Sequence, residues 1–156
     1  IIIPDGGFRN FYSPDSTVEK EYEDGIIRNN LQTSLDGPGV FIFAISKAPK
    51  SILGLMDHFN INLNQVDYFI LHQANKILNE KIRNKLKLPT DKVPYSLDEY
   101  GNTSSSSIPL TLVTRLRDKL ISEKCKIVAC GFGVGLSWGT VYLETGKIAC
   151  PEIIMV

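Results

Sequence analysis

Three short stretches of the chain contain residue types that could stabilise negative charge on an oxygen atom. They are His72, Asn102 and the glycine-rich run Gly131–Gly135. The imidazole and the carboxamide can donate hydrogen bonds from their side chains, and the glycine-rich run can donate from backbone N–H groups. Donors held in place in this way stabilise an enolate or a tetrahedral oxyanion. Although a lone histidine is more often structural, the combination predicts a site where a carbonyl oxygen becomes negative.

The elements expected around these stretches bring them to the ends of strands. An apolar run, Val66–Leu71, predicts a strand that ends at His72, and an amphipathic helix is expected from Asn75 to Leu88. A second strand, Lys126–Cys130, leads into the glycine-rich run. Ligands of open α/β sheets bind at the carboxyl ends of strands. We therefore expect the three stretches to meet at one edge of a sheet.

Composition and charge limit the possible functions. The chain has 156 residues, 43% hydrophobic and 22% charged, which fits one compact globular domain. Seventeen basic and 17 acidic residues cancel, so net charge gives no support to a nucleic-acid partner. No apolar run approaches the ~20 residues of a membrane span, and we expect a cytoplasmic protein. The cysteines, Cys125, Cys130 and Cys150, form no C-x-x-C pair, so no metal site is predicted, and Cys130 reads as a buried apolar residue.

The first 40 residues carry weaker signals. Ile1–Pro4 resembles the end of a strand, Phe11–Asp24 a surface loop and Gly25–Ser34 a further strand. Because the chain opens inside an apolar run, we expect it to be a piece of a longer protein.

The remaining segments complete an alternation of helices and strands. Val40–Phe59 predicts a helix that Pro49 kinks or divides in two. Val93–Leu97 predicts a short strand, Ile108–Leu120 a helix, and Ser137–Leu143 the last strand. The four serines that precede Ile108 could form a linker, but we favour close packing of small side chains at the start of a helix.

The helix expected from Asn75 to Leu88 has a basic outer face. Lys76, Lys81 and Arg83 belong to it, and Glu80 is its only acidic residue. This face is either simply solvated or a docking patch for an acidic partner, whose attraction would weaken with salt.

Two familiar motifs fail when their context is considered. Gly135–Gly139 matches the G-x-S-x-G element of serine hydrolases, but a strand pattern rather than a helix follows Ser137, and no histidine comes after it. The glycine-rich run also resembles a dinucleotide-binding turn, which must open a helix. The same strand pattern excludes that function.

In their order and spacing, the motifs resemble those of β-ketoacyl-acyl-carrier-protein synthase III. The matching segments are His72–Asn75, Tyr100–Ser104 leading into Ile108–Leu110, and Gly131–Gly139. Asp36-Gly37, followed by Val40-Phe41 and Phe43-Ala44, is similar to a further family segment. The likeness covers residues 25–143.

The resemblance implies an α/β, thiolase-like fold of two similar halves, each a mixed β-sheet of about five strands covered by helices, in a homodimer. Residues 1–24 would be the end of the preceding half with a connecting loop, and residues 25–156 the C-terminal condensing-enzyme domain. The implied enzyme is an acyltransferase of fatty-acid synthesis. Its cysteine accepts an acyl group from acyl-CoA, and malonyl-acyl-carrier protein then loses carbon dioxide and attacks the thioester. No cofactor beyond these substrates is implied.

The resemblance also assigns roles to residues. His72 Nε2 and Asn102 Nδ2 would hold the malonyl thioester oxygen as the enolate forms, the backbone N–H of Val134 would serve a second oxyanion hole, and Phe132 would wall the site. Many relatives carry glycine in place of Val134, but a backbone donor suffices. Many also carry a docking arginine where this chain has Ile77, so docking of acyl-carrier protein is expected on Lys76, Lys81 and Arg83.

The family's nucleophilic cysteine belongs to the N-terminal half, and the three cysteines here fall outside every motif. Alone, the chain should not complete the condensation, and its partners would be that N-terminal half and acyl-carrier protein. Two alternatives stay open: a specialised polyketide-type relative, and a non-catalytic thiolase-like module that dimerises or binds carrier protein.

Overall fold

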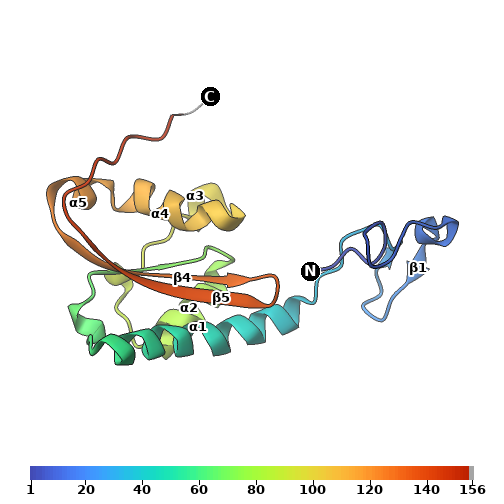
Figure 1. The fold of residues 1–156 in the computed structure, drawn as a ribbon, viewed down its shortest axis with the longest axis horizontal. Coiled ribbons are helices and arrows are strands. Elements are labelled where there is room, and N and C mark those ends of the chain that lie inside the picture. Colours follow the sequence, from blue (N-terminus) through green and yellow to red (C-terminus); the bar gives the residue numbers. More distant parts are fainter. Residues whose placement is uncertain (155–156) are drawn as a thin grey trace. The chain divides into compact units, whose positions relative to one another are not determined.

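A computed structural model describes residues 1–154 of the chain (Figure 1). It divides into two compact units, Ile1–Gly39 and Val40–Val156, each treated separately below. The domain boundary predicted between residues 24 and 25 separates two family domains, whereas the division after Gly39 separates two compact units. The predicted boundary is therefore not tested and stays a prediction.

The first unit contains short elements tied together by polar side chains. They are η1 (Pro14–Thr17), β1 (Lys20–Glu21) and β2 (Ile27–Arg28), with β1 and β2 antiparallel. The Oδ2 atom of Asp5 accepts hydrogen bonds from Ser16 Oγ at 2.8 Å and from Asn30 Nδ2 at 2.9 Å. These bonds hold together segments that have few buried apolar residues.

Two predictions for this unit need correction. The strand expected over Gly25–Ser34 is reduced to Ile27–Arg28 and to an isolated bridge between Ile2 and Ser34. The surface loop expected over Phe11–Asp24 contains η1 and β1. The prediction of a longer strand was wrong because Ile26 and Ile27 are both exposed. These apolar residues therefore have no buried core to pack against.

The second unit places a mixed sheet between helices. Its main elements are α1 (Gly37–Phe59, which begins in the first unit), η2 (Leu63–Gln65), β3 (Tyr68–Leu71), α2 (Lys76–Lys85), η3 (Thr90–Lys92), α3 (Leu97–Tyr100), η4 (Ser104–Ser106), α4 (Ser107–Arg115), α5 (Arg117–Ser122), β4 (Cys125–Gly133) and β5 (Ser137–Thr145). β4 pairs in parallel with β3 and antiparallel with β5. The mixed sheet is confirmed, and it holds three strands rather than about five.

Alternate residues of the strands build two cores, one on each face of the sheet. Phe69 and Leu71 of β3, with Val128 and Cys130 of β4, pack against α1 and α2. Ile70, Ile127 and Ala129 point to the other face and pack with Leu116 and Leu120. Figure 1 shows α1 and α2 on one side of β4 and β5, and α3 to α5 on the other. Burial on both faces explains the nearly continuous apolar runs in β3 and β4.

Pro49 lies inside α1, which is one helix and not two. A proline removes the hydrogen bond to the carbonyl four residues earlier, here that of Ile45. The Nζ atom of Lys85 donates to this carbonyl at 3.1 Å. A side chain from α2 therefore replaces the lost backbone donor.

By length and composition alone, α1 is the one helix of residues 1–154 that could cross a membrane. Its buried stripe is Ala44, Ala48, Ile52 and Met56, which pack in the core with β3 and β4. This packing is the pattern of a helix that covers a sheet.

Two further predictions were wrong in part. Val93–Leu97 forms no strand, because its backbone groups bond to side chains instead: the Tyr95 carbonyl accepts from Arg115 Nε, and the Ser96 N–H donates to Gln73 Oε1. The helix expected over Ile108–Leu120 is divided into α4 and α5 at Leu116.

β4 and β5 form the predicted hairpin across the glycine-rich run. Because Ser137 begins a strand, both the serine-hydrolase motif and the dinucleotide-binding motif lack the helix that they need.

Candidate active site

His72 follows β3 directly at the carboxyl end of the sheet. Its backbone N–H donates to the Cys130 carbonyl at 2.9 Å, which extends the pairing of β3 with β4 beyond Leu71. The side chain is half-buried. Burial lowers the pKa of the imidazole, and a backbone hydrogen bond with Ser104 opposes this shift. His72 is therefore held toward its neutral form, which has one N–H donor.

Phe132 lies beside His72 on the neighbouring strand. Their ring centroids are 5.5 Å apart and the rings meet edge to face at 76°. Phe132 is buried in the core between the sheet and α1. Its position next to the imidazole fits the predicted role of a site wall that excludes water.

Asn102 is held by Ser104, two residues later in the chain. The backbone N–H of Ser104 donates to Asn102 Oδ1 at 2.9 Å. The Ser104 backbone also acts to raise the pKa of the His72 imidazole, so Ser104 lies near both predicted catalytic side chains. Because Oδ1 is engaged, the amide group Nδ2 of the exposed Asn102 is left to donate to a ligand.

A tight turn before Asn102 depends on glycine. Gly101 has φ 65° and ψ −156°, a conformation that L side chains rarely adopt. Its N–H donates to the Leu97 carbonyl and ends α3. The turn lets the chain leave α3 and present Asn102 beside Ser104.

Two polar residues near His72 were not predicted from the sequence. Ser107 Oγ lies 2.7 Å from His72 Nδ1 and accepts from the Gln73 N–H at 3.2 Å. Gln73 is fully buried and donates from Nε2 to the Leu71 carbonyl at 2.8 Å. The run of four serines was the available signal. Only Ser107 is buried, so the packing expected for the whole run holds for this residue alone.

Val134 lies two residues beyond Phe132, in the turn between β4 and β5. Its side chain is exposed, and its carbonyl accepts from Ser137 Oγ at 2.8 Å. This bond closes the turn, and the predicted role of the Val134 N–H stays a prediction.

The basic residues of α2 differ in how far they are engaged. Arg83 bonds to Glu80 through Nε and Nη2 and donates from Nη1 to the Leu88 carbonyl at 2.7 Å, with 14% of its side chain exposed. Lys76 binds both carboxylate oxygens of Asp98, at 3.0 and 2.9 Å, but both side chains are largely exposed. Lys81 is exposed. Lys81 and Lys76 are therefore more accessible to a partner than Arg83.

The cysteines lie inside the fold. All three are free and buried. Burial raises the pKa of the Cys130 thiol to about 11, although a hydrogen bond from Thr140 opposes the shift. Cys130 is confirmed as a buried residue, and its neutral thiol is a poor nucleophile.

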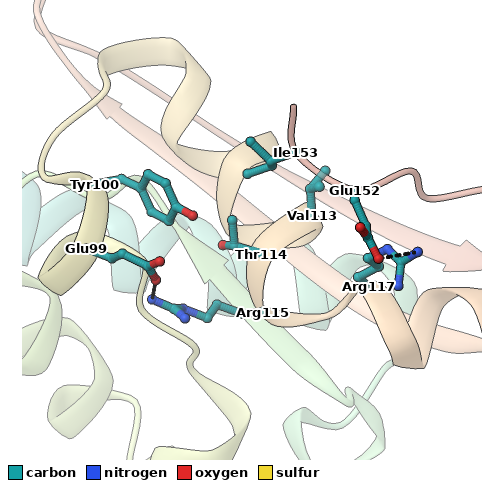
Figure 2. Close-up of a pocket in the computed structure, with 8 residues that line it drawn as sticks. All are labelled: Glu99, Tyr100, Val113, Thr114, Arg115, Arg117, Glu152 and Ile153. Carbon is teal, nitrogen blue, oxygen red and sulfur yellow. Dashed lines mark hydrogen bonds and ion pairs between the residues drawn. The ribbon is translucent and has the colours of Figure 1, made fainter. Parts of the chain in front are cut away.

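A pocket of about 220 Å³ lies between α3, α4 and the C-terminal segment (Figure 2). Two ion pairs lie at its wall: Arg115 with Glu99 at 2.8 Å, and Arg117 with Glu152 at 3.5 Å. None of the predicted catalytic residues lines it. Because both guanidinium groups already have carboxylate partners, the pocket offers no free cation to an anionic ligand.

Comparison with known proteins shows which family has this arrangement. Residues 56–145, more than half of the chain, match the family described as 3-oxoacyl-[acyl-carrier-protein (ACP)] synthase III C terminal. The chain belongs to this family. All three stretches that carry His72, Asn102 and Val134 fall within the matched residues.

Relatives of the synthase III family agree with this assignment. β-Ketoacyl-[acyl-carrier-protein] synthase III of Porphyra umbilicalis is 40% identical over 110 residues, 70% of this chain and 34% of the relative. The enzyme of the same name from Lactococcus lactis is 38% identical over 113 residues, 71% of this chain and 35% of the relative. The chain thus spans about a third of the length of these relatives.

Solved structures confirm the thiolase-like α/β fold of the synthase III family. A crystal structure of 3-oxoacyl-(acyl-carrier-protein) synthase III superposes with a TM-score of 0.84 at 31% identity, over 92% of this chain and 42% of that one. The 3-oxoacyl-(acyl-carrier protein) synthase of Burkholderia xenovorans gives 0.80 at 33% identity, over 94% and 40%. The resemblance drawn from the motifs, to the C-terminal half of a synthase III, is confirmed.

Proposed function

We propose that this chain is the enolate-stabilising portion of an acyltransferase that condenses an acyl thioester with malonyl-acyl-carrier protein in fatty-acid synthesis. The observation that carries the proposal is the position of Ser104 near both side chains: its N–H donates to Asn102 Oδ1, and its backbone influences the pKa of His72. Two side chains that can donate a hydrogen bond, a neutral imidazole and a carboxamide, are therefore near the same short segment of main chain. Family membership supports the same chemistry.

In the proposed reaction, the bond between the malonyl carboxylate and the methylene carbon breaks and carbon dioxide leaves. The bonding electrons form an enolate, and His72 Nε2 and Asn102 Nδ2 donate hydrogen bonds to its oxygen. The enolate carbon then attacks the acyl thioester carbonyl. A carbon–carbon bond forms, and the carbon–sulfur bond breaks to release the thiolate. One such preorganised donor contributes about 3–4 kcal/mol of barrier lowering in a comparable oxyanion hole.

The cysteine that carries the acyl group would come from an N-terminal half. The three cysteines of this chain are buried, and Cys130 is held as a neutral thiol. The same observation favours the second candidate, a non-catalytic module that binds carrier protein. We further propose a cytoplasmic homodimer that needs no cofactor beyond its acyl-CoA and malonyl-acyl-carrier-protein substrates. The Val134 N–H would serve the second oxyanion hole.

A fusion enzyme tests the catalytic proposal. The N-terminal portion of the Lactococcus lactis relative is joined to this chain, and carbon dioxide release from malonyl-acyl-carrier protein is measured. His72→Ala should abolish release while the cysteine still accepts an acyl group, which shows that the fusion is folded. His58→Ala is the matched control, because His58 is the other histidine and lies exposed on α1. Release by His72→Ala at the parent rate would refute the assignment.

The carrier-protein surface is tested separately. We propose that acyl-carrier protein docks on the exposed face of α2 through Lys81 and Lys76. Lys81→Glu should weaken binding to acyl-carrier protein, and the loss should shrink as salt is added. Lys124→Glu is the control, because it makes the same charge change at an exposed site. Lys124 lies just before the start of β4, away from His72. Equal binding by both variants would exclude α2 as the docking surface. Binding of carrier protein without carbon dioxide release by the fusion would favour the non-catalytic module.

A further inference from the structure

The contact between His72 and Ser107 is the starting point. Ser107 is the first residue of α4 and is 1% exposed. Its Oγ lies 2.7 Å from His72 Nδ1, and it accepts a hydrogen bond from the Gln73 N–H at 3.2 Å. The hydroxyl oxygen therefore already accepts one hydrogen bond, from a backbone N–H that can only donate.

The remaining hydrogen of the hydroxyl decides the protonation of the imidazole. If Nδ1 carried the proton, Ser107 Oγ would accept two hydrogen bonds. The hydrogen of the Ser107 hydroxyl would then be buried, and no other hydrogen bond found in residues 1–154 gives it an acceptor. Burying a hydroxyl donor without an acceptor is unfavourable. If Ser107 instead donates to Nδ1, its hydroxyl both accepts and donates a hydrogen bond. In the neutral ring, the proton then lies on Nε2.

A second set of buried hydrogen bonds holds Ser107 in this position. Thr111 Oγ1 donates to the Ser107 carbonyl at 2.8 Å, so Ser96 Oγ, 2.7 Å away, must donate to Thr111. The Ser96 N–H in turn donates to Gln73 Oε1 at 3.1 Å. These four residues are at most 1% exposed. The circuit joins α4 to the segment after β3, and it fixes Ser107 relative to Gln73, the residue that follows His72.

We propose that Ser107 is a positioning residue that keeps His72 in the Nε2–H tautomer, with Nε2 as the donor at the active site. The catalytic consequence rests on the proposed function, because an Nε2–H donor is what the enolate oxygen would need. The tautomer itself rests on the two contacts of the Ser107 hydroxyl and does not depend on the proposed function.

The tautomer can be measured on this chain without any activity. In a ¹⁵N-labelled sample above pH 8, long-range ¹H–¹⁵N correlation should show an unprotonated Nδ1 and a protonated Nε2 for His72. In Ser107→Ala the Nδ1–H tautomer should gain population, whereas Ser106→Ala should match the parent. Ser106 is the exposed neighbour whose side chain makes no capping bond. A protonated Nδ1 in the parent, or identical spectra for Ser107→Ala and the parent, would overturn the proposal.

Activity of the fusion enzyme tests the positioning role. Ser107→Ala should lower kcat for decarboxylation about tenfold or more, by analogy with the loss of a group that orients a metal-bound histidine, with KM little changed. Ser107→Thr, which keeps the hydroxyl, should recover much of kcat, and Ser106→Ala should retain it. Equal kcat for Ser107→Ala and Ser106→Ala would overturn the role. If His72→Ala itself kept decarboxylation, the proposed function would fail while the tautomer result for Ser107 stood.

Discussion

The backbone N–H of Ser104 donates to Asn102 Oδ1 at 2.9 Å. This bond engages Oδ1 and leaves Nδ2 as the free group of the carboxamide, the group proposed to donate to the enolate. Asn102→Asp keeps the acceptor for Ser104 but replaces the donor with a negatively charged oxygen. We expect decarboxylation by the fusion enzyme to fall about 10²–10³-fold, the usual loss for one oxyanion-hole donor.

Asn64→Asp is the matched control for this substitution. Asn64 is exposed in η2, so it introduces the same charge away from the site and should leave the rate unchanged. Decarboxylation by Asn102→Asp within twofold of the control would show that Asn102 Nδ2 does not contact the enolate.

The pKa of His72 predicts how the site responds to acid. Burial lowers this pKa below the ordinary value of 6.5, and the Ser104 backbone bond only partly offsets the effect. A group whose pKa is lower in the folded state stays neutral as pH falls through 6.5, while the unfolded chain takes up the proton. The histidine should therefore contribute a loss of folded stability just below pH 6.5. Following the His72 Hε1 signal against pH should give a midpoint below 6.5 in the folded chain.

The same titration in urea supplies the reference, with a midpoint near 6.5. Decarboxylation by the fusion enzyme should stay constant down to pH 6.5 and fall only below it. A folded midpoint above that of the urea sample would contradict the assignment of a neutral donor.

The parts of the site that were predictable depend on local pattern. The strand before His72 and the hairpin at Gly131–Gly135 are encoded in runs whose apolar residues are buried on both sides of the sheet. The helix after His72 was predictable from its period, and Asn75 caps it by accepting from the Leu78 N–H.

The parts that were missed depend on side chains far away in the sequence. Ser107 meets His72 across 35 residues, and nothing in a run of four serines marks which one will be buried. Pro49 suggested a broken helix, but Lys85 from α2 satisfies the exposed carbonyl of Ile45. Val93–Leu97 has the composition of a strand, yet Gln73 and Arg115 take its backbone bonds. Only the assembled fold brings these partners together.

The network of Glu80, Arg83 and Tyr95 predicts a loss of stability in acid. Hydrogen bonds from Arg83, and next from Tyr95, lower the pKa of Glu80 from 4.5 to about 2. A depressed carboxyl pKa contributes stability above its unfolded value, and this contribution is lost as pH falls from 4.5 toward 2. Glu80→Gln should therefore show a shallower decline in the free energy of unfolding over this range than the parent. Urea unfolding at several pH values measures it, and parallel curves for the two proteins would contradict the role of Glu80.

Asn79 of α2 is fully buried, and neither side-chain polar atom has a hydrogen-bond partner among residues 1–154. Its neighbours Leu78 and Ile82 belong to the core, so a leucine of similar shape should fit. Leaving a buried polar group unpaired costs about 1–3 kcal/mol, and we expect Asn79→Leu to raise the free energy of unfolding by this amount. Asn84→Leu, on the exposed face of the same helix, gives the gain from helix propensity alone. Urea unfolding compares the two variants, and a lower stability for Asn79→Leu than for Asn84→Leu would show that the amide is bonded in the native protein.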